Sequence, residues 1–185
     1  ERERQFGADV AHELRTPLTA LVTSAELLPE DESSALVRRQ VDRLRRLVED
    51  LLELFRAESG QAEVRREPVD LGVLATDATE QATLVVEDPA VVETDPRRVH
   101  LIVSNLVRNA AAHGGQRVTV TVRGASIEVR DDGPGYPEQV LTQGPLRFRR
   151  PSGAAGSGLG LAIASAQAEL LGARLTLAND DGAVA

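Results

Sequence analysis

A histidine near the N-terminus lies beside residues that could make it reactive. The run HELRTPL occupies residues 12–18. On a helix, His12 and Thr16 are four residues apart and share a face, with Glu13 beside them. An imidazole can act as a neutral nucleophile near neutral pH, and an adjacent carboxylate can hold its tautomer and accept the departing proton. A lone surface histidine is more often simply solvated, so the chemistry depends on what else the chain carries.

The composition excludes several classes of function. The chain has 185 residues, with 29 acidic residues, 21 basic residues and a formal charge of −8. Nucleic acids and anionic membranes would repel such a chain, so we expect no nucleic-acid partner. There is no cysteine, which removes disulfides and thiolate metal sites. Every basic residue is arginine, so phosphate contacts must come from Arg, backbone amides or a metal.

The first 60 residues predict two amphipathic helices. Apolar residues recur at three- and four-residue spacing through residues 1–28. A heptad seam over residues 37–55 predicts a second helix, with Ser33 or Ser34 as its cap. So much apolar surface cannot be buried within one hairpin, so we expect two copies to form a dimeric four-helix bundle. The alternative is a hairpin that folds back on its own domain.

The remaining residues, 61–185, alternate short strands with helices. Asp95 followed by Pro96 is a strong helix start signal. Strands and helices mixed in this way predict an α+β domain, an α/β sandwich whose mixed, mostly antiparallel sheet is covered by helices on one face. The expected helices span residues 70–82, 96–112 and 158–172, and the expected strands span residues 84–87, 91–93, 117–123, 126–130 and 174–178.

Two asparagines on the helix at 96–112 could face a phosphate ligand. Asn105 and Asn109 are four residues apart and lie together off the apolar stripe. An asparagine side chain supplies a neutral amide oxygen for Mg²⁺ and N–H donors for phosphate oxygens. Capping or ordinary surface polarity explains the isolated pair equally well.

An aspartate and a glycine run add to this pattern. Asp131 shares parity with the apolar residues of its strand, so its carboxylate faces the buried side and needs a partner. Residues 156–160, GSGLG, lead directly into a helix, where backbone amides and the helix dipole can face phosphate. Such a glycine run is weak evidence alone. With Asp131 and the two asparagines, it predicts one cleft for the base, metal and triphosphate of a nucleotide.

Five short motifs together resemble those of sensor histidine kinases. HELRTPL resembles the phospho-acceptor box of that family. The resemblance covers nearly the whole chain and implies a phospho-acceptor and dimerisation domain over residues 1–60. It also implies a catalytic domain of the histidine kinase/chaperone-type ATP-binding fold over residues 61–185, with ATP and Mg²⁺ as cofactors. The other boxes are NLVRNA at 105–110 (asparagine box), DDGPG at 131–135 and GSGLGLAIA at 156–164 (first and second glycine boxes), and RFRR at 147–150 (phenylalanine box).

The resemblance assigns roles around the base and the metal. Asn109 would ligate Mg²⁺, Asn105 would assist at the phosphates, and Asp131 would accept a hydrogen bond from the adenine amino group. Gly133 and Gly135 would let the chain pass under the base.

The resemblance also assigns a lid over the phosphates. Gly156, Gly158 and Gly160 would form the end of that lid. Phe148 would pack it, and Arg150 would reach phosphate. Ala112 departs from the family, which often has Lys or Arg there, and the lid is short.

The activity implied is ATP-dependent autophosphorylation of His12 with Glu13 as proton acceptor. The phosphoryl group would pass to an Asp of a response regulator receiver domain, and Thr16 could position a water that dephosphorylates that regulator. A dimeric signalling scaffold with a degenerate nucleotide pocket is the competing interpretation. An ATPase or protein-serine kinase with the same nucleotide fold is a weaker one, because such proteins lack the histidine hairpin.

The location expected for this chain follows from the same resemblance. No apolar run approaches the roughly 20 residues needed to cross a bilayer. The sequence begins ERERQF without Met, so we interpret it as an excised soluble portion of something longer. We expect the cytoplasmic portion of an inner or plasma membrane sensor protein.

Overall fold

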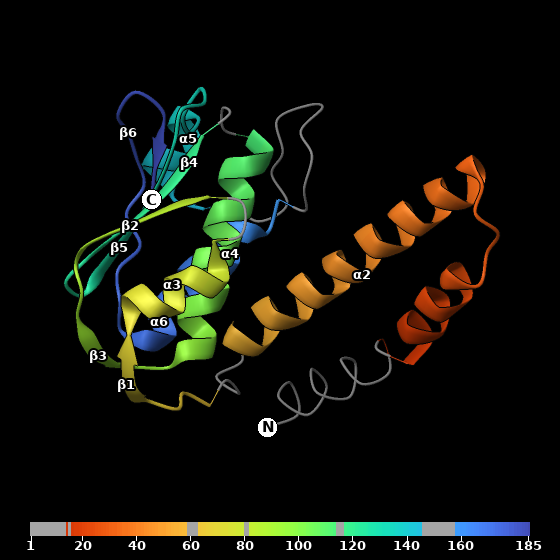
Figure 1. Cartoon of the computed structure of the whole chain (residues 1–185), viewed down its shortest axis with the longest axis horizontal. Helices are drawn as coiled ribbons and strands as arrows, with labels where there is room; N and C mark the ends of the chain where they lie inside the picture. Colours follow the sequence, from red (N-terminus) through yellow and green to blue (C-terminus); the bar gives the residue numbers. More distant parts are fainter. Residues whose placement is uncertain (1–13, 15, 59–62, 80–81, 114–116, 146–157) are drawn as a thin grey trace. The chain divides into compact units, whose positions relative to one another are not determined.

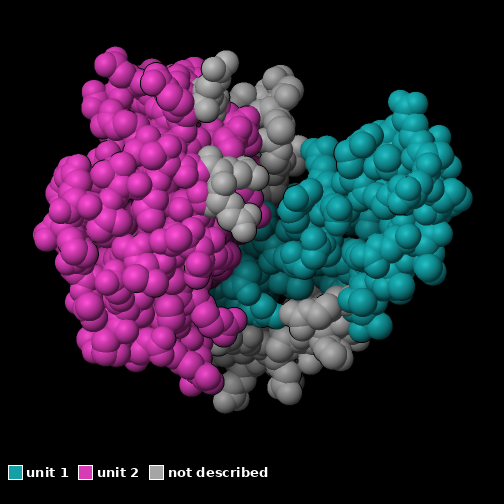
Figure 2. Space-filling model, viewed as in Figure 1, with its two compact units in different colours: residues 1–62 teal, residues 63–185 magenta. Residues whose placement is uncertain are grey.

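The computed structural model describes residue 14 and residues 16–58, 63–79, 82–113, 117–145 and 158–185. The chain divides into two compact units, residues 1–62 and residues 63–185 (Figure 2). Within the described ranges, no helix combines the length and the apolar character needed to cross a membrane.

The N-terminal unit is built from helices joined by a tight turn. Residues 16–26 are helical, and α2 spans Glu32–Glu58. The Asp31 carboxylate caps α2, because its Oδ1 accepts a hydrogen bond from the Ser34 amide at 2.7 Å. Hydrogen bonds from Ser34 hold the pKa of Asp31 below its usual value. The predicted cap at Ser33 or Ser34 is therefore wrong, because the earlier carboxylate is the acceptor at this helix start.

An arginine links α2 back to the turn that precedes it. Arg38 donates to the backbone carbonyl of Leu28 at 3.1 Å and lies 3.4 Å from the carbonyl of Pro29. Ala25, before the turn, and Val41, after it, are both buried. These contacts make the described part of this unit a helical hairpin.

The C-terminal unit contains seven strands and four helices in its described residues. Most of these strands and helices follow the predicted order, and their ends lie within a few residues of the predicted ends. The strands are β1 (Glu67–Asp70), β2 (Thr83–Asp88), β3 (Val91–Thr94), β4 (Val118–Arg123), β5 (Ser126–Asp131), β6 (Ala178–Asn179) and β7 (Ala183–Val184), and the helices are α3 (Leu71–Ala78), α4 (Pro96–His113), α5 (Glu138–Gln143) and α6 (Gly160–Leu171).

The main sheet is mixed and mostly antiparallel, as predicted. Its strand order is β2-β4-β5-β7-β6. Only the β2–β4 pair is parallel among the described strands of this sheet. A separate two-stranded antiparallel ribbon joins β1 to β3. The mixed sheet therefore has the topology expected for the α/β sandwich.

Helices α3 and α4 pack on one face of the sheet, and α6 packs against α4 (Figure 1). Strand β4 shows why, because its valines alternate with threonines and only the valines are buried. The valine face packs against the apolar stripe of α4, as the sequence pattern predicts. The core residues of α4, β4 and α6 include Val99, Val103, Leu106, Val107, Ala110, Val118, Val120, Val122, Ala164 and Leu171.

Two of the helices in this unit, α3 and α4, are capped by aspartates, as predicted. The Asp70 carboxylate accepts from the Gly72 and Val73 amides at the start of α3. Asp95 accepts from the Arg97 and Arg98 amides at the start of α4, at 3.1 and 3.3 Å. Both caps satisfy amides that have no partner inside the helix.

Two local predictions differ from the structure. The strand expected at 174–178 is limited to Ala178–Asn179. Leu175 packs against the core instead, so the alternating pattern reflects burial rather than strand pairing. Helix α5 lies in a stretch for which neither a helix nor a strand was predicted. Pro137 followed by Glu138 precedes this short helix, and this pair of residues is typical of a helix N-terminus.

Asp95 gives a pH-dependent prediction for stability. Burial alone would raise its pKa, but hydrogen bonds from the Arg65, Arg98 and Arg97 amides and the Arg98 charge lower it below the usual 3.8. Ionised Asp95 therefore stabilises the fold above pH 3.8, and this contribution is lost as pH falls through the lower folded value. Asp95→Asn should reduce the free energy of unfolding at pH 7 by about 1–3 kcal/mol.

The measurement is urea denaturation followed by far-UV circular dichroism at pH 7 and pH 3. The difference between wild type and Asp95→Asn should shrink at pH 3, because below pH 3.8 the unfolded state binds a proton at Asp95 more readily than the folded state does. Asp77→Asn on the exposed side of α3 is the control and should change stability little. An equal difference at both pH values would contradict the prediction.

Candidate nucleotide site

The start of α6 lies against the middle of α4. Gly158 has a φ of +70°, a left-handed conformation that favours glycine. Leu159 follows, fully buried, and its carbonyl accepts the Ile163 amide at 2.9 Å. A Cβ placed on Gly160 would lie 3.4 Å from Oδ1 of Asn105. The glycine end of α6 and the asparagine face of α4 are therefore in direct contact.

Asn105 is buried and its amide is used within α4. Its side chain is 1% exposed, and Nδ2 donates to the Leu101 carbonyl at 2.7 Å. Its Oδ1 accepts from Nη2 of Arg108 at 2.5 Å. Asn105 therefore holds an arginine cation beside the start of α6. Sequence reasoning missed Arg108, although its position three residues after Asn105 on the helix was a usable signal.

Asn109 lies one turn further along α4 and is half-buried. The neighbouring Tyr136 shows what surrounds it. Burial raises the pKa of the Tyr136 phenol to about 12, and the nearby Asp131 charge acts in the same direction. A hydrogen bond with the Asn109 side chain lowers this pKa. The phenol of Tyr136 is therefore near both residues. This brings together the predicted base-binding carboxylate and the predicted metal ligand.

Asp131 ends β5 with its side chain turned inward, as its parity predicts. It is 5% exposed. Its Oδ1 accepts the Gly133 amide at 2.9 Å and lies 3.4 Å from the Ala183 amide, which also donates to it. Asp132 points the other way and pairs with Arg117 at 3.1 Å. Two adjacent aspartates thus have different roles, one inside the site and one on the surface.

The turn after Asp131 is held by the C-terminal strands. Gly135 has a φ of +79°, and a Cβ there would lie 2.7 Å from the Asn179 side chain. That Asn179 carboxamide accepts the Tyr136 amide at 2.7 Å and donates to the Tyr136 carbonyl at 2.9 Å. Gly135 is therefore needed for its conformation and for this close approach. No local pattern in the sequence signals Asn179, because it acts on a turn 43 residues away.

Several predicted site residues lie outside the described residues. Thr16 is described, helical and exposed. Among the described residues, no group of three or more His, Asp or Glu side chains could hold a metal ion. The residues outside the description are His12, Glu13, Phe148, Arg150 and Gly156.

The described part of the site combines three kinds of group. A carboxylate lies at the end of β5, an arginine and an amide lie on α4, and the amino end of α6 adds backbone N–H groups and positive dipole. An anion can be held at the helix end while the carboxylate accepts from a polar ring edge. These groups are suited to holding a nucleotide, and the domain that carries them is preceded in the chain by a helical hairpin.

The family comparisons agree with both halves of that description. The model for "Histidine kinase-, DNA gyrase B-, and HSP90-like ATPase" matches residues 94–184. The model for "His Kinase A (phospho-acceptor) domain" matches residues 2–60. The chain belongs to the sensor histidine kinases of two-component systems.

Individual curated relatives are sensor proteins. Sensor protein CseC of Streptomyces avermitilis is 46% identical over 188 residues, covering 97% of this chain and 38% of CseC. Sensor protein QseC of Salmonella typhi is 36% identical over 202 residues, covering 96% of this chain and 45% of QseC. The chain therefore spans less than half the length of these curated relatives.

Two solved structures share the fold. The crystal structure of full-length ShkA in complex with AMPPNP matches with a TM-score of 0.81 at 25% identity, over 97% of this chain and 44% of ShkA. The Acinetobacter baumannii histidine kinase AdeS matches with a TM-score of 0.65 at 26% identity, over 94% of each chain.

Gly182 supports the position of Asp131 and gives a test of the site's backbone. Its φ is +142°, and a Cβ there would lie 1.8 Å from the Asp131 carbonyl oxygen. Gly182→Ala should therefore displace that carbonyl and lower the free energy of unfolding by about 3 kcal/mol or more. Urea denaturation followed by circular dichroism measures this loss.

Gly172→Ala is the matched control. Gly172 also has a positive φ, +72°, but no atom lies within 4 Å of a Cβ there. Its substitution should cost only the left-handed strain, about 1–2 kcal/mol. Equal losses for the two variants would mean that the Gly182–Asp131 contact is not what requires glycine at position 182.

Proposed function

We propose that this chain is the catalytic core of a sensor histidine kinase that uses ATP to phosphorylate His12. One observation carries the proposal: the phospho-acceptor match over residues 2–60, which includes His12, and the ATPase match over residues 94–184 occur in the same chain. A histidine kinase needs both a histidine to receive the phosphoryl group and a nucleotide domain to supply it.

The nucleotide would be held by residues that the structure brings together. Asp131 accepts from the adenine amino group, because its carboxylate is buried at a turn and retains acceptor capacity beyond its backbone contacts. Gly158 and Gly160 present the amino end of α6 to the phosphates. Arg108, held by Asn105, supplies a positive charge near that end. The side-chain positive charge near the phosphates comes from arginine, since the chain has no lysine.

The site also fits a magnesium ion carried mainly by the nucleotide. Mg²⁺ in phosphoryl-transfer sites is typically bound by one or two protein oxygens, by phosphate oxygens and by water. Asn109 offers such an oxygen, and the described residues contain no larger cluster of acidic or histidine ligands. When bound, Mg²⁺ would neutralise charge on the β- and γ-phosphates. ShkA, a structural relative, was solved with the ATP analogue AMPPNP.

Phosphoryl transfer then depends on alignment. A ring nitrogen of neutral His12 attacks the γ-phosphorus, the bond to the β–γ bridging oxygen breaks, and ADP leaves. Glu13 accepts the proton released from the imidazole. The products are phosphohistidine and ADP. Phosphohistidine is acid-labile, which separates it from phosphoserine and phosphothreonine.

The hairpin would form a homodimer through an apolar stripe on α2. Four side chains on this helix are 40–45% exposed in the single chain, three of them at seven-residue spacing. Seven-residue spacing of apolar residues is the pattern of helices that pack side by side in bundles. A second copy of the hairpin would bury this stripe. The residues are Val37, Leu44, Leu51 and Phe55.

The next step is phosphotransfer to a response regulator. The phosphoryl group of His12 passes to an Asp of a receiver domain that docks on the hairpin. Thr16 follows His12 by four residues and is exposed on its helix, so its hydroxyl can position a water for the reverse reaction on the regulator. The full-length protein would be a membrane-anchored sensor with this portion in the cytoplasm, as the resemblance to sensor histidine kinases implies; two of the curated relatives are named sensor proteins.

The phospho-acceptor is tested by replacing each histidine in turn. The chain has three histidines, and His12→Gln should abolish acid-labile labelling by [γ-³²P]ATP because the attacking nitrogen is gone. His100→Gln and His113→Gln are the controls and should retain labelling. ATP binding with no labelling of wild type would instead indicate a signalling scaffold with a degenerate pocket. Retained acid-labile labelling of His12→Gln would also contradict the proposal.

Thr16→Ala tests the phosphatase role separately. It should slow dephosphorylation of a receiver domain that the wild-type chain phosphorylates, by about tenfold or more, because the attacking water loses its partner. Labelling of His12 should persist. Thr23→Ala, seven residues further along the helix and also exposed, is the control. A phosphatase rate unchanged by Thr16→Ala would refute this role.

A further inference from the structure

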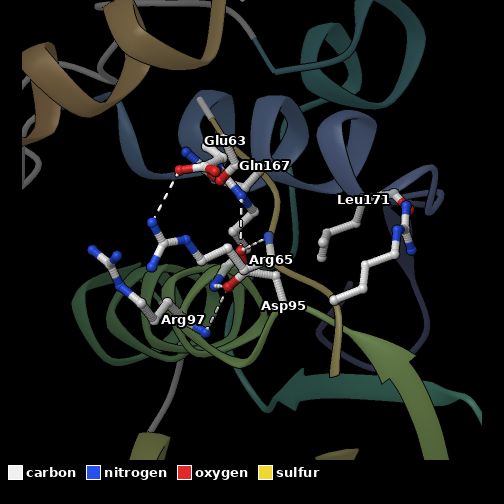
Figure 3. A network of polar contacts seen from close by, with 8 residues as sticks. Glu63, Arg65, Asp95, Arg97, Gln167 and Leu171 are labelled. Atoms are coloured by element: carbon white, nitrogen blue, oxygen red, sulfur yellow. Dashed lines mark hydrogen bonds and ion pairs between the residues drawn. The ribbon is translucent and has the colours of Figure 1, made fainter. Parts of the chain in front are cut away.

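A network of polar contacts joins three separate parts of the C-terminal unit (Figure 3). Arg98 lies in the first turn of α4, and its side chain is 12% exposed. Nη1 donates to Oε1 of Gln167 on α6 at 2.6 Å, and Nη2 donates to the backbone carbonyl of Glu63 at 2.7 Å. Nε lies 3.4 Å from Oδ2 of Asp95. One guanidinium thus connects α4, α6 and the segment that leads into β1.

That segment, residues 63–66, is tied down at further points. The Arg65 amide donates to Oδ2 of Asp95 at 2.9 Å. Arg66 donates through Nη2 to the Leu171 carbonyl at the end of α6, at 2.8 Å. A cation is favoured at a helix C-terminus, where carbonyl groups are unpaired. Residues 63–66 are therefore fixed to both helices.

Gln167 is unusual because part of it is unsatisfied. Its side chain is 1% exposed, and Nε2 has no hydrogen-bond partner among the described residues. An unpaired buried N–H is destabilising, and a leucine of similar size would pack on α6 without that penalty. What glutamine adds over leucine is the oxygen that receives Arg98.

The Arg98–Gln167 contact is separate from the nucleotide end of the same helix pair. Arg98 precedes Asn105 by seven residues on α4, and Gln167 follows Gly160 by seven residues on α6. Each spacing is about 10 Å along a helix. The two helices therefore run antiparallel, with nucleotide groups at one contact and residues 63–66 held at the other.

We propose that Asp95, Arg98 and Gln167 form a clamp that fixes residues 63–66 to α4 and α6, and that this clamp positions the nucleotide unit for transfer to His12. This inference rests on the proposed kinase function. Arg98 and Gln167 are positioning residues, because their contacts are with the connecting segment rather than with the nucleotide groups. Residue 63 follows the end of α2 by only five positions, so the clamp sets the length of chain between the hairpin and the nucleotide unit.

Release of the clamp would lengthen that connection. Four residues separate Glu58 from Glu63, and eight separate Glu58 from Glu67, where β1 begins. The effective concentration of two tethered groups falls roughly as the −3/2 power of the tether length, so a tether of twice the length lowers it about threefold. The transfer rate should fall by that factor while nucleotide affinity stays the same.

The test compares Gln167→Leu and Arg98→Ala with two controls in the whole chain. Arg97→Ala removes the same charge from an exposed neighbour on the same turn. Gln167→Glu keeps an oxygen acceptor for Arg98 and removes the unpaired N–H. The readouts are the rate of His12 labelling at saturating ATP, the KM for ATP, the melting temperature, and hydrogen exchange at the Arg65 amide.

Gln167→Leu and Arg98→Ala should speed Arg65 exchange, lower the maximal labelling rate about threefold and leave the KM unchanged. Gln167→Leu also leaves Nη1 of Arg98 without its acceptor, so its melting temperature should fall. A purely structural role would lower the melting temperature but leave the labelling rate unchanged well below that temperature. Both controls should behave as wild type. Unchanged Arg65 exchange, an unchanged or faster labelling rate, or a KM that rises with the loss of rate would overturn the clamp.

Exchange at Arg65 requires no nucleotide, so it tests the clamp even if the kinase proposal fails. Failure of the proposed function would appear differently, as wild-type protein that never labels His12.

Discussion

The contact between α4 and α6 is the constraint on which the rest of the site depends. At one point a glycine on α6 lies against a buried asparagine on α4. At a second point, about 10 Å away, a buried arginine and glutamine join the same helices. Two contacts of this kind fix both the spacing and the rotation of one helix against the other. The phosphate-binding end of α6 is therefore positioned by residues well removed from it.

The base end of the site depends on a second constraint, at the end of β5. Asp131 receives backbone amides from its own turn and from β7. Asn179, in strand β6 of the final hairpin, holds both the amide and the carbonyl of Tyr136. The last eight residues of the chain thus complete a turn that begins about fifty residues earlier. This explains why a short C-terminal hairpin matters to the buried carboxylate at the end of β5.

Patterns that report local energetics predicted the fold well. The valine–threonine alternation of β4 and the Asp95 cap of α4 each depend on neighbours in sequence, and both were correct. The cap of α2 was misplaced because two serines and a carboxylate compete for the same amides. The strand at 174–178 was wrong because Leu175 is buried by the core without pairing in a ladder. Pattern alone cannot separate those two causes of burial.

The site was predictable to the extent that its residues cluster in motifs. Asp131 could be placed on the buried side by parity, and Asn105 and Asn109 by helical spacing. Asn179, Arg98 and Gln167 could not be found in this way, because each acts on a segment between 35 and 69 residues away in sequence. Such contacts form only when the fold brings distant segments together. Arg108 is the intermediate case, visible as a neighbour of Asn105 but not interpretable until its contact with that buried amide is known.

The most direct test of the nucleotide site is an NMR titration of the ¹⁵N-labelled chain with a nonhydrolysable ATP analogue and Mg²⁺. The arrangement of α4, α6 and the Asp131 turn predicts saturable shifts in the Asn109 side-chain amide and in the amides of Gly133, Gly135, Gly158 and Gly160. Residues of α2 should be unaffected. The absence of saturable shifts, or shifts confined to residues away from these three elements, would contradict it.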